Sequence, residues 1–378
     1  MDPDIPFSRP RLTGREPELV AEVLRSPRWS GDGEMTRRAA RLLERSLGGG
    51  RALLTSSCTD ALEMAALLLD LGPGDEVVVP AFTFVTTASA FALRGVKLVF
   101  VDIRPDTLCL DERQLARAVT KRTRAIVPVH YAGVACAMNE ITEIAAPVGA
   151  SVVEDNAHGL FATWRGRPLG SLGRLATQSF HDTKNITCGE GGALIVNDPT
   201  LVERAEVVRD KGTNRARFFR GEVDKYTWVA LGSSFLPSEL TAAVLVAQLE
   251  AAEQIQSARQ RVWATYATGL ASWAERHGVT LPIIPSDCVH PAHMFYLVMP
   301  DLERRTAMLA HLRTRRIHAV FHYQPLHLSE LARQWGGRPG DLPVTERIAD
   351  TLIRLPLYPD LEHGDQARVL DAVTSFIP

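Results

Sequence analysis

Short runs of apolar, often β-branched residues alternate with amphipathic segments through the first half of this 378-residue chain. The apolar runs predict strands at residues 52–54, 76–80, 97–101, 125–129, 151–154 and 193–196. Segments with helical spacing lie at residues 59–70, 86–93, 112–118, 138–148 and 201–209. Continuous apolar strands separated by helices are typical of a mainly parallel sheet with helices on both faces. The alternation therefore predicts an α/β fold.

The pattern changes beyond residue 209. Residues 209–225 are rich in Lys, Arg and Gly and predict a long loop, and residues 239–270 predict a long helix or a helix pair. After Trp273, strand-like runs at 294–299 and 319–321 flank a helical segment at 304–313. We therefore predict a large domain over residues 1–262 and a smaller C-terminal α+β domain over residues 263–378.

Charge and cysteine content exclude several classes of protein. The net charge of -2 gives no indication of nucleic acid or a membrane surface as a partner. The five cysteines include no CxxC pair, so we expect neither a disulfide framework nor a metal site. The chain has no signal-peptide pattern and no apolar stretch long enough to span a bilayer. These features predict a cytoplasmic protein.

Unusual residues follow the predicted strands, at the edge of the sheet where α/β proteins bind ligands. The turn Ser57-Cys58-Thr59 follows the first strand and opens a helix, whose free N–H groups suit a phosphate. The alternative is ordinary helix capping by Ser or Thr. Phe84 follows the second strand and could stack on a planar ring, although a core phenylalanine is the alternative.

A carboxylate and a histidine follow the strand at 151–154. Asp155 could hold a ring nitrogen in its protonated form, and His158 could touch the same ring or its hydroxyl. The alternative is a helix cap with a solvated histidine.

A lysine in a polar setting precedes a glycine-rich turn. Ser179 to Asn185 contains Lys184, and Gly189 to Gly192 follows. Lysine attacks a carbonyl only when its surroundings lower its pKa, and glycines let the backbone approach a planar ligand closely. Such a lysine could hold an aldehyde cofactor as a Schiff base, and the alternative is a surface lysine beside a turn.

These motifs occur in an order that resembles the DegT-type sugar-nucleotide aminotransferases, which are pyridoxal-phosphate (PLP) enzymes of fold type I. The resemblance covers nearly the whole chain. The motifs that carry it are Gly72 to Val77, Pro80 to Phe84, Glu154-Asp155 with His158, Ser179 to Lys184, and Gly189 to Gly192.

The resemblance implies a role for each motif residue. Lys184 would form the Schiff base with PLP and later move protons between the cofactor and the substrate. Asp155 would pair with the pyridinium nitrogen, which makes the ring an electron sink. His158 would lie against the ring or its O3', and Phe84 would stack on the ring face.

The phosphate site departs from the family pattern in two places. Backbone N–H groups of Cys58 and Thr59 would hold the phosphate with the Ser179 hydroxyl, but the family usually has a Ser-Gly-Thr-like turn there. Ser234 stands where the family commonly has an asparagine that reaches the phosphate of the neighbouring subunit. The resemblance therefore implies a homodimer with shared active sites, in which the Ser234 hydroxyl could take that role.

One branch, the dTDP-4-amino-4,6-dideoxygalactose transaminases, is similar in further segments. These segments are 211–215, 218–221, 223–228, 233–240, 293–296 and 321–327. In this branch Arg215 and Arg220 could bind the diphosphate of a sugar nucleotide, since guanidinium groups bind such anions bidentately. His322 and Tyr323 could contact the sugar or the partner subunit. The alternatives are a solvated loop for the arginines and a structural role for His322 and Tyr323.

The implied reaction moves the amino group of L-glutamate to C4 of dTDP-4-keto-6-deoxy-D-glucose and releases 2-oxoglutarate. The rivals are a C3 ketosugar aminotransferase and a catalytically silent paralogue. A 3-dehydratase of the same family would carry histidine in place of Lys184. A dinucleotide-dependent dehydrogenase would need a GxGxxG after the first strand, which is absent.

Overall fold

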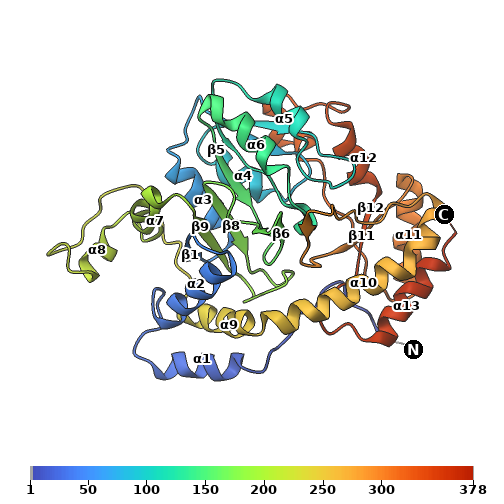
Figure 1. Ribbon diagram of the computed structural model, residues 1–378, viewed down its shortest axis with the longest axis horizontal. Coiled ribbons are helices and arrows are strands. Elements are labelled where there is room, and N and C mark those ends of the chain that lie inside the picture. The colour runs from blue at the N-terminus through green and yellow to red at the C-terminus, as the bar shows by residue number, and fades with distance from the viewer. Residues whose placement is uncertain (1–2, 378) are drawn as a thin grey trace.

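A seven-stranded sheet forms the centre of the molecule in the computed structural model, which describes residues 3–377 (Figure 1). The strand order is β1-β9-β8-β5-β4-β2-β3, and only β9 runs against the others. The bounds are β1 Arg51–Thr55, β2 Glu76–Pro80, β3 Lys97–Val101, β4 Thr123–Ile126, β5 Ser151–Asp155, β8 Leu175–Ser179 and β9 Gly192–Val196. The predicted α/β fold with a mainly parallel sheet is confirmed.

Different helices cover the two faces of the sheet. Alternate residues of a strand point to opposite faces, so Val77 and Val79 pack with one set of helices and Val78 with another. The first set is α3 Cys58–Leu68, α4 Thr86–Ala92 and α7 Val202–Arg209. On the opposite face lie α5 Glu112–Ala118 and α6 Met138–Ala145, with α1 Glu16–Arg25, α2 Glu34–Ser46 and α9 Glu239–Glu250 nearer β1.

The C-terminal part has its own apolar core, which Ile5 joins from the N-terminal segment. Strands β11 Phe295–Val298 and β12 Leu352–Leu355 pair antiparallel there. The helices around this core are α10 Ala252–His277, α11 Leu302–Thr314 and α13 His363–Thr374, whereas α12 Pro343–Thr351 packs Ile348 and Ala349 into the apolar cluster that also contains Val78 of the main sheet. The expected strand at 319–321 is wrong, because only Val320 forms a bridge, to Arg354 of β12. The domain boundary at residue 263 stays a prediction, and α10 runs through it without a break.

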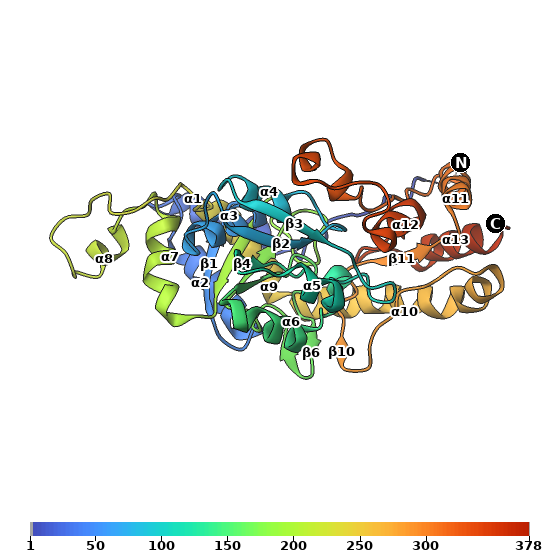
Figure 2. The same ribbon diagram turned by 90° about the horizontal axis from the view of Figure 1, so that it is seen from above.

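A small sheet of β10 Cys288–Val289, β6 Thr163–Trp164 and β7 Arg167–Pro168 lies beside the main sheet (Figure 2). Among residues 3–377, no helix has the length and apolar character that crossing a bilayer requires.

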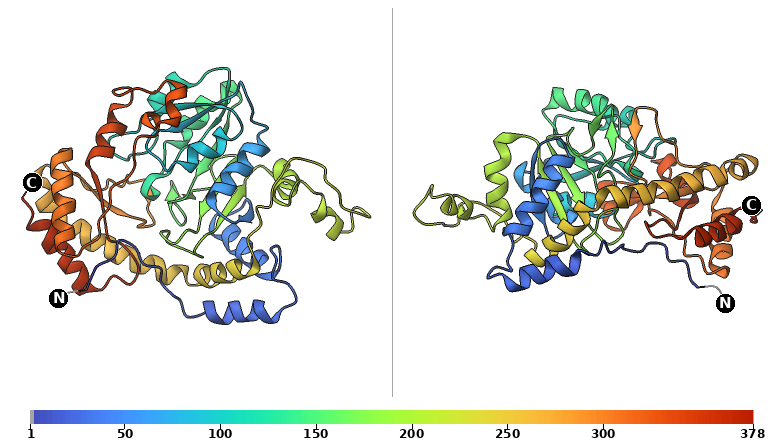
Figure 3. Two further views of the ribbon diagram at one scale, coloured as in Figure 1. Left: turned by 180° about the vertical axis from the view of Figure 1, so that it is seen from behind. Right: turned by 60° about the horizontal axis from the view of Figure 1, so that its bottom comes forward.

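Residues 210–232 form an arm that projects away from the body of the protein (Figures 1 and 3). The arm is not the uninterrupted loop that its composition predicts, since α8, Arg215–Phe219, forms within it. The ring of Phe218 in this short helix contacts the rings of Phe219 and Tyr226. Trp228 on the same arm is 72 % exposed.

Candidate active site

A cavity of about 560 Å³ opens where β1, β2, β5 and β8 end. This is the edge at which α/β sheets bind ligands, and the volume suits a small molecule. Most of the predicted site residues line it, namely Ser57, Cys58, Thr59, Phe84, Asp155, His158, Ser179, Lys184, His322 and Tyr323. The fold therefore brings together residues that lie far apart in the sequence.

Three predicted residues do not line this cavity. Arg220 on the arm pairs with Glu206 at 2.7 Å and Glu222 at 2.6 Å. Arg215 lies 3.9 Å from Asp210, with its guanidinium over a neighbouring ring. Ser234 lies at the base of the arm, where its backbone bridges to Asp210. Their predicted roles in binding the diphosphate and a neighbouring phosphate stay predictions.

Lys184 has the electrostatic setting that a carbonyl nucleophile needs. It follows β8, and its backbone N–H donates to His181 O at 2.9 Å. Burial lowers the pKa of Lys184 to about 8, with Arg354 acting in the same direction and with Cys58 and Asp155 opposing it. About a tenth of the amine is therefore unprotonated at pH 7, a far larger fraction than in an exposed lysine.

Asp155 is held in a chain of hydroxyl groups. The Thr87 hydroxyl donates to its Oδ2 at 2.7 Å, and the Ala157 N–H donates to its Oδ1 at 3.1 Å. Thr83 Oγ1 lies 2.8 Å from Thr87 Oγ1. The single hydroxyl hydrogen of Thr87 is used in its bond to Asp155, so Thr87 Oγ1 accepts from Thr83.

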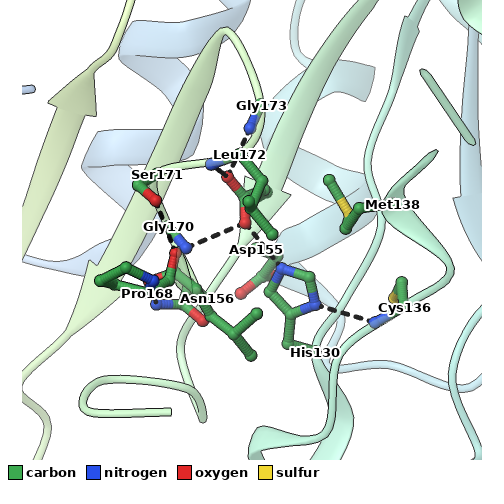
Figure 4. A network of polar contacts seen from close by, with 12 residues as sticks. His130, Cys136, Met138, Asp155, Asn156, Pro168, Gly170, Ser171, Leu172 and Gly173 are labelled. Atoms are coloured by element: carbon green, nitrogen blue, oxygen red, sulfur yellow. Dashed lines mark hydrogen bonds and ion pairs between the residues drawn. The ribbon is translucent and has the colours of Figure 1, made fainter. Parts of the chain in front are cut away.

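Glu154 does not line the cavity and is fully buried in a polar network, whose members His130, Gly170, Leu172 and Gly173 are labelled in Figure 4. Its carboxylate lies 2.8 Å from His130 Nε2 and accepts from the N–H groups of Gly170, Leu172 and Gly173 at 2.9, 2.7 and 2.6 Å. Burial by itself raises the pKa of Glu154, but these bonds outweigh it and the net pKa is lowered. The network therefore fixes the end of β5, where Asp155 sits.

Three histidine rings form one wall of the cavity. His158 stacks on His293 with ring centroids 4.5 Å apart and an interplanar angle of 19°, and His322 lies at 6.3 Å from His158. Burial lowers the pKa of each ring well below its usual value, and the positive charges of Lys184 and Arg354 add to this effect. All three rings are therefore neutral at pH 7.

The first turn of α3 supplies a site for an anion. Ser57 Oγ accepts from the Asp60 N–H at 3.0 Å, so this serine does cap the helix. Cys58 and Thr59 lie in the first turn of α3, where backbone N–H groups have no partner within the helix, and both residues line the cavity at the positive end of the helix dipole. Cys58 has ordinary helical geometry, so its replacement of the usual glycine causes no strain.

Gly192 is the glycine that this turn requires. A Cβ atom at residue 192 would overlap with the backbone of Ser57 and Cys58, so β9 can lie this close to the turn only when residue 192 is glycine.

Phe84 is 56 % exposed, which excludes the alternative of a core phenylalanine. An anion site, a carboxylate, an accessible ring and an amine of lowered pKa together fit a planar aldehyde that carries a phosphate.

The lining also includes residues to which the sequence analysis gave no role, among them Thr83, Thr87, His293 and Arg354. The two threonines lie in the same Thr-rich segment as Phe84, and their spacing of four residues was a signal in the sequence that could have identified them. Arg354 interrupts the apolar run of β12, which is the signal of a buried charge. Within residues 3–377, no group of His, Cys, Asp or Glu is placed to hold a metal ion.

Comparisons with known proteins agree over the whole length. A family model described as the DegT/DnrJ/EryC1/StrS aminotransferase family matches residues 10–374. The spore coat polysaccharide biosynthesis protein SpsC of Bacillus subtilis is 30% identical over 99% of this chain and 97% of its own. The structure of S. venezuelae DesV is 31% identical, with a TM-score of 0.89 and full coverage of both chains. Spr1654 from Streptococcus pneumoniae, solved in a PLP-form, is 25% identical, with a TM-score of 0.91 over 98% of each chain.

Proposed function

This chain belongs to the DegT/DnrJ/EryC1/StrS aminotransferase family, and we propose that it transfers the amino group of L-glutamate to C4 of dTDP-4-keto-6-deoxy-D-glucose. Membership makes it a PLP-dependent sugar aminotransferase of fold type I, with PLP as its cofactor. The ketosugar, the position C4 and the dTDP carrier are our proposal.

The observation that carries the proposal is the convergence of Lys184, Asp155 and the first turn of α3 on one cavity. The N–H groups of this turn would hold the phosphate. Asp155 would keep the ring nitrogen protonated, and its bond from Thr87 fixes the direction of the carboxylate. When bound, PLP withdraws electrons from the substrate carbon beside the amino group and acidifies its proton.

Lys184 is the residue that we assign to move this proton. With a pKa of about 8, its amine can accept a proton and return it near neutral pH. The neutral wall of His158 and His293 adds no competing positive charge beside the lysine. We place His158 against the ring oxygen of the cofactor, because its Nδ1 is buried without a hydrogen-bond partner in the described chain.

The similarity to C4-specific transaminases supports the choice of the sugar nucleotide. The similar segments include the arm that carries Arg215 and Arg220. They also include the segment with His322 and Tyr323, both of which line the cavity. We propose that the arm and Ser234 serve the site of a second subunit in a homodimer. Exposed apolar side chains on the arm, such as Trp228 at 72 %, support this arrangement because association would bury them.

The reaction is tested by incubating the purified protein with L-glutamate and dTDP-4-keto-6-deoxy-D-glucose. We expect equimolar 2-oxoglutarate and a dTDP-4-amino sugar, whose C4 proton couplings in NMR spectra also give its configuration. Lys184→Ala should abolish both products. Amination of the 3-keto isomer alone would support the C3 alternative, and a protein that binds PLP without responding to glutamate would be a silent paralogue.

The shared site has its own test. Trp228→Glu should shift the sedimentation of the protein from dimer to monomer and lower its PLP affinity, whereas Ser234→Ala should lower PLP affinity and leave the dimer intact. A monomeric wild-type protein that binds PLP normally would contradict the shared site.

A further inference from the structure

Strand β3 is the last strand at one side of the seven-stranded sheet, so one of its edges faces no further strand. The Lys97 N–H donates to Asp75 O at 2.9 Å, and Val101 O accepts at 3.0 Å from the residue that follows β2. Lys97 and Val101 therefore direct their backbone groups at β2. Successive residues of a strand direct these groups to opposite edges, so Leu98 and Phe100 direct theirs outward.

The outward backbone groups of Leu98 and Phe100 have no partner in the described chain. Among residues 3–377, no hydrogen bond outside the pairing of β3 with β2 reaches the N–H or the C=O of either residue. Leu98 is only 2 % exposed. Backbone groups that are shielded in this way are normally paired with protein, ordered water or a ligand, so a partner from outside the chain is needed here.

A cavity of about 180 Å³ lies against this edge of β3. Residues 97–100 form one side of it, and Trp335 to Gly337, at the end of the 3₁₀ helix Leu331–Trp335, form another. The half-buried Trp335 ring lies 6.3 Å from the Phe100 ring at an interplanar angle of 60°. No residue lines both this cavity and the active-site cavity, so the two are separate.

His327 adds an unpaired ring nitrogen to the wall of this cavity. Its Nε2 lies 3.1 Å from Glu346 Oε1. A carboxylate only accepts, so Nε2 carries the hydrogen of this bond. His327 Nδ1 is buried and has no hydrogen-bond partner in the described chain. The cavity is thus surrounded by aromatic surface and by polar atoms that the chain itself leaves unpaired.

The spacing of the free backbone groups indicates the kind of ligand. Leu98 O and the Phe100 N–H flank one position, at which a residue of a further parallel strand would donate to the first and accept from the second. A flat ring with a donor beside an acceptor presents the same pair of groups. Adenine has N6–H beside N1, and thymine has N3–H beside O4. Trp335 supplies an aromatic surface on which such a ring can stack.

We infer that this cavity is a binding site for a nucleobase, at the free edge of β3 and apart from the active site. An extended peptide that pairs with the edge fits less well. It would continue past Phe100, where the Asp111 N–H already donates to Asp102 O at 3.0 Å. A volume of about 180 Å³ also holds a single base and its first sugar atoms, and not a strand of typical length.

The test measures nucleoside binding to the PLP-loaded protein by calorimetry. The ligands are adenosine and thymidine, each compared with a methylated form that lacks the donor, N6,N6-dimethyladenosine and N3-methylthymidine. We expect at least one unmodified nucleoside to bind and its methylated form to bind roughly tenfold more weakly. Trp335→Ala should weaken binding by roughly tenfold or more, and Trp335→Phe by less than about threefold, since it keeps a ring for stacking.

Leu331→Ala is the matched control, because Leu331 lies in the same 3₁₀ helix, is exposed and does not line the cavity. It should bind as the wild type does. The inference is overturned if neither nucleoside binds the wild type, which would leave only water in the cavity. It is also overturned if binding is equally strong in W335A, as it would be at the active site. If W335A does not fold, equal binding of the methylated and unmodified nucleosides to the wild type still contradicts pairing with β3.

Discussion

Thr87 donates a 2.7 Å hydrogen bond to Asp155 across 68 residues of sequence, and so links the start of α4 to the end of β5. Because Thr83 donates to Thr87 in turn, the carboxylate stands at the end of a polarised chain of hydroxyl groups. We propose that the chain orients Asp155 for the ring nitrogen of the cofactor.

Replacing Thr87 by valine removes this bond at nearly constant volume. We expect a loss of about 1 kcal/mol in PLP binding, a roughly fivefold higher dissociation constant, because Asp155 loses a donor that holds it in place. Fluorescence titration of the apoprotein measures it. Thr87→Ser keeps the hydroxyl and serves as the matched control. Equal PLP affinity in T87V and wild type would show that Asp155 is oriented without Thr87.

The lowered pKa of Lys184 predicts a pH dependence. Only the unprotonated amine attaches to PLP, so the attachment rate of the apoprotein should rise with pH and level off above about 8. The rate is followed by trapping the product with borohydride at short times. Lys184→Ala should show no trapped product at any pH. A half-maximal rate near pH 10.5, the usual range for lysine, would contradict the effect of burial.

The buried contacts of Glu154 predict a loss of stability on substitution. Glu154→Gln places an amide N–H₂ opposite backbone N–H groups or His130, so we expect the free energy of unfolding to fall by about 3 kcal/mol at pH 7. Urea unfolding of the apoprotein measures the change. Glu140→Gln on the exposed face of α6 is the control and should change little.

The same contacts predict how this loss varies with pH. The folded pKa of Glu154 is lowered, so its contribution is complete above the unfolded value near 4.5 and disappears as the pH falls through the folded value. The difference between E154Q and wild type should therefore shrink below pH 4.5. A difference that is constant from pH 7 to pH 4 would mean that the ionised carboxylate is not the stabilising form.

Sequence patterns predicted the elements that carry an unbroken apolar run. Strand β2 has the predicted bounds, residues 76–80, because Val77, Val78 and Val79 are all buried. Strand β8 was missed because it buries Thr177 and Gln178, which interrupt the apolar pattern. Whether a polar residue of a strand is buried depends on the neighbouring strands, and the sequence of one segment does not indicate which strands will lie beside it.

The candidate site shows the same limit. Asp155 and Lys184 could be predicted because each follows a recognisable strand or precedes a glycine turn. Thr87 and Arg354 could not, since the bond from Thr87 to Asp155 and the place of Arg354 in the cavity lining arise only when distant segments come together in the fold. Arg215 and Arg220 were predicted from the charge of their loop and its similarity to one branch of the family, and the structure gives each an acidic neighbour on or near the arm.

Gly192 provides a test of the phosphate turn that leaves every polar group in place. Gly192→Ala adds only a methyl group, but that group would overlap with the backbone of Ser57 and Cys58, so either β9 or the turn must move. We expect a cost of about 2 kcal/mol, visible as a lower melting temperature of the apoprotein and as weaker PLP binding. Gly364→Ala in α13 is the matched control, since its Cβ meets no atom within 4 Å and stability should be unchanged or slightly higher.

If G192A binds PLP as tightly as G364A does, the turn at Ser57 and Cys58 does not hold the phosphate in the geometry described. A loss of PLP affinity larger than the loss of stability would place the strain in the phosphate site itself, because a displaced first turn of α3 no longer directs its N–H groups at one point.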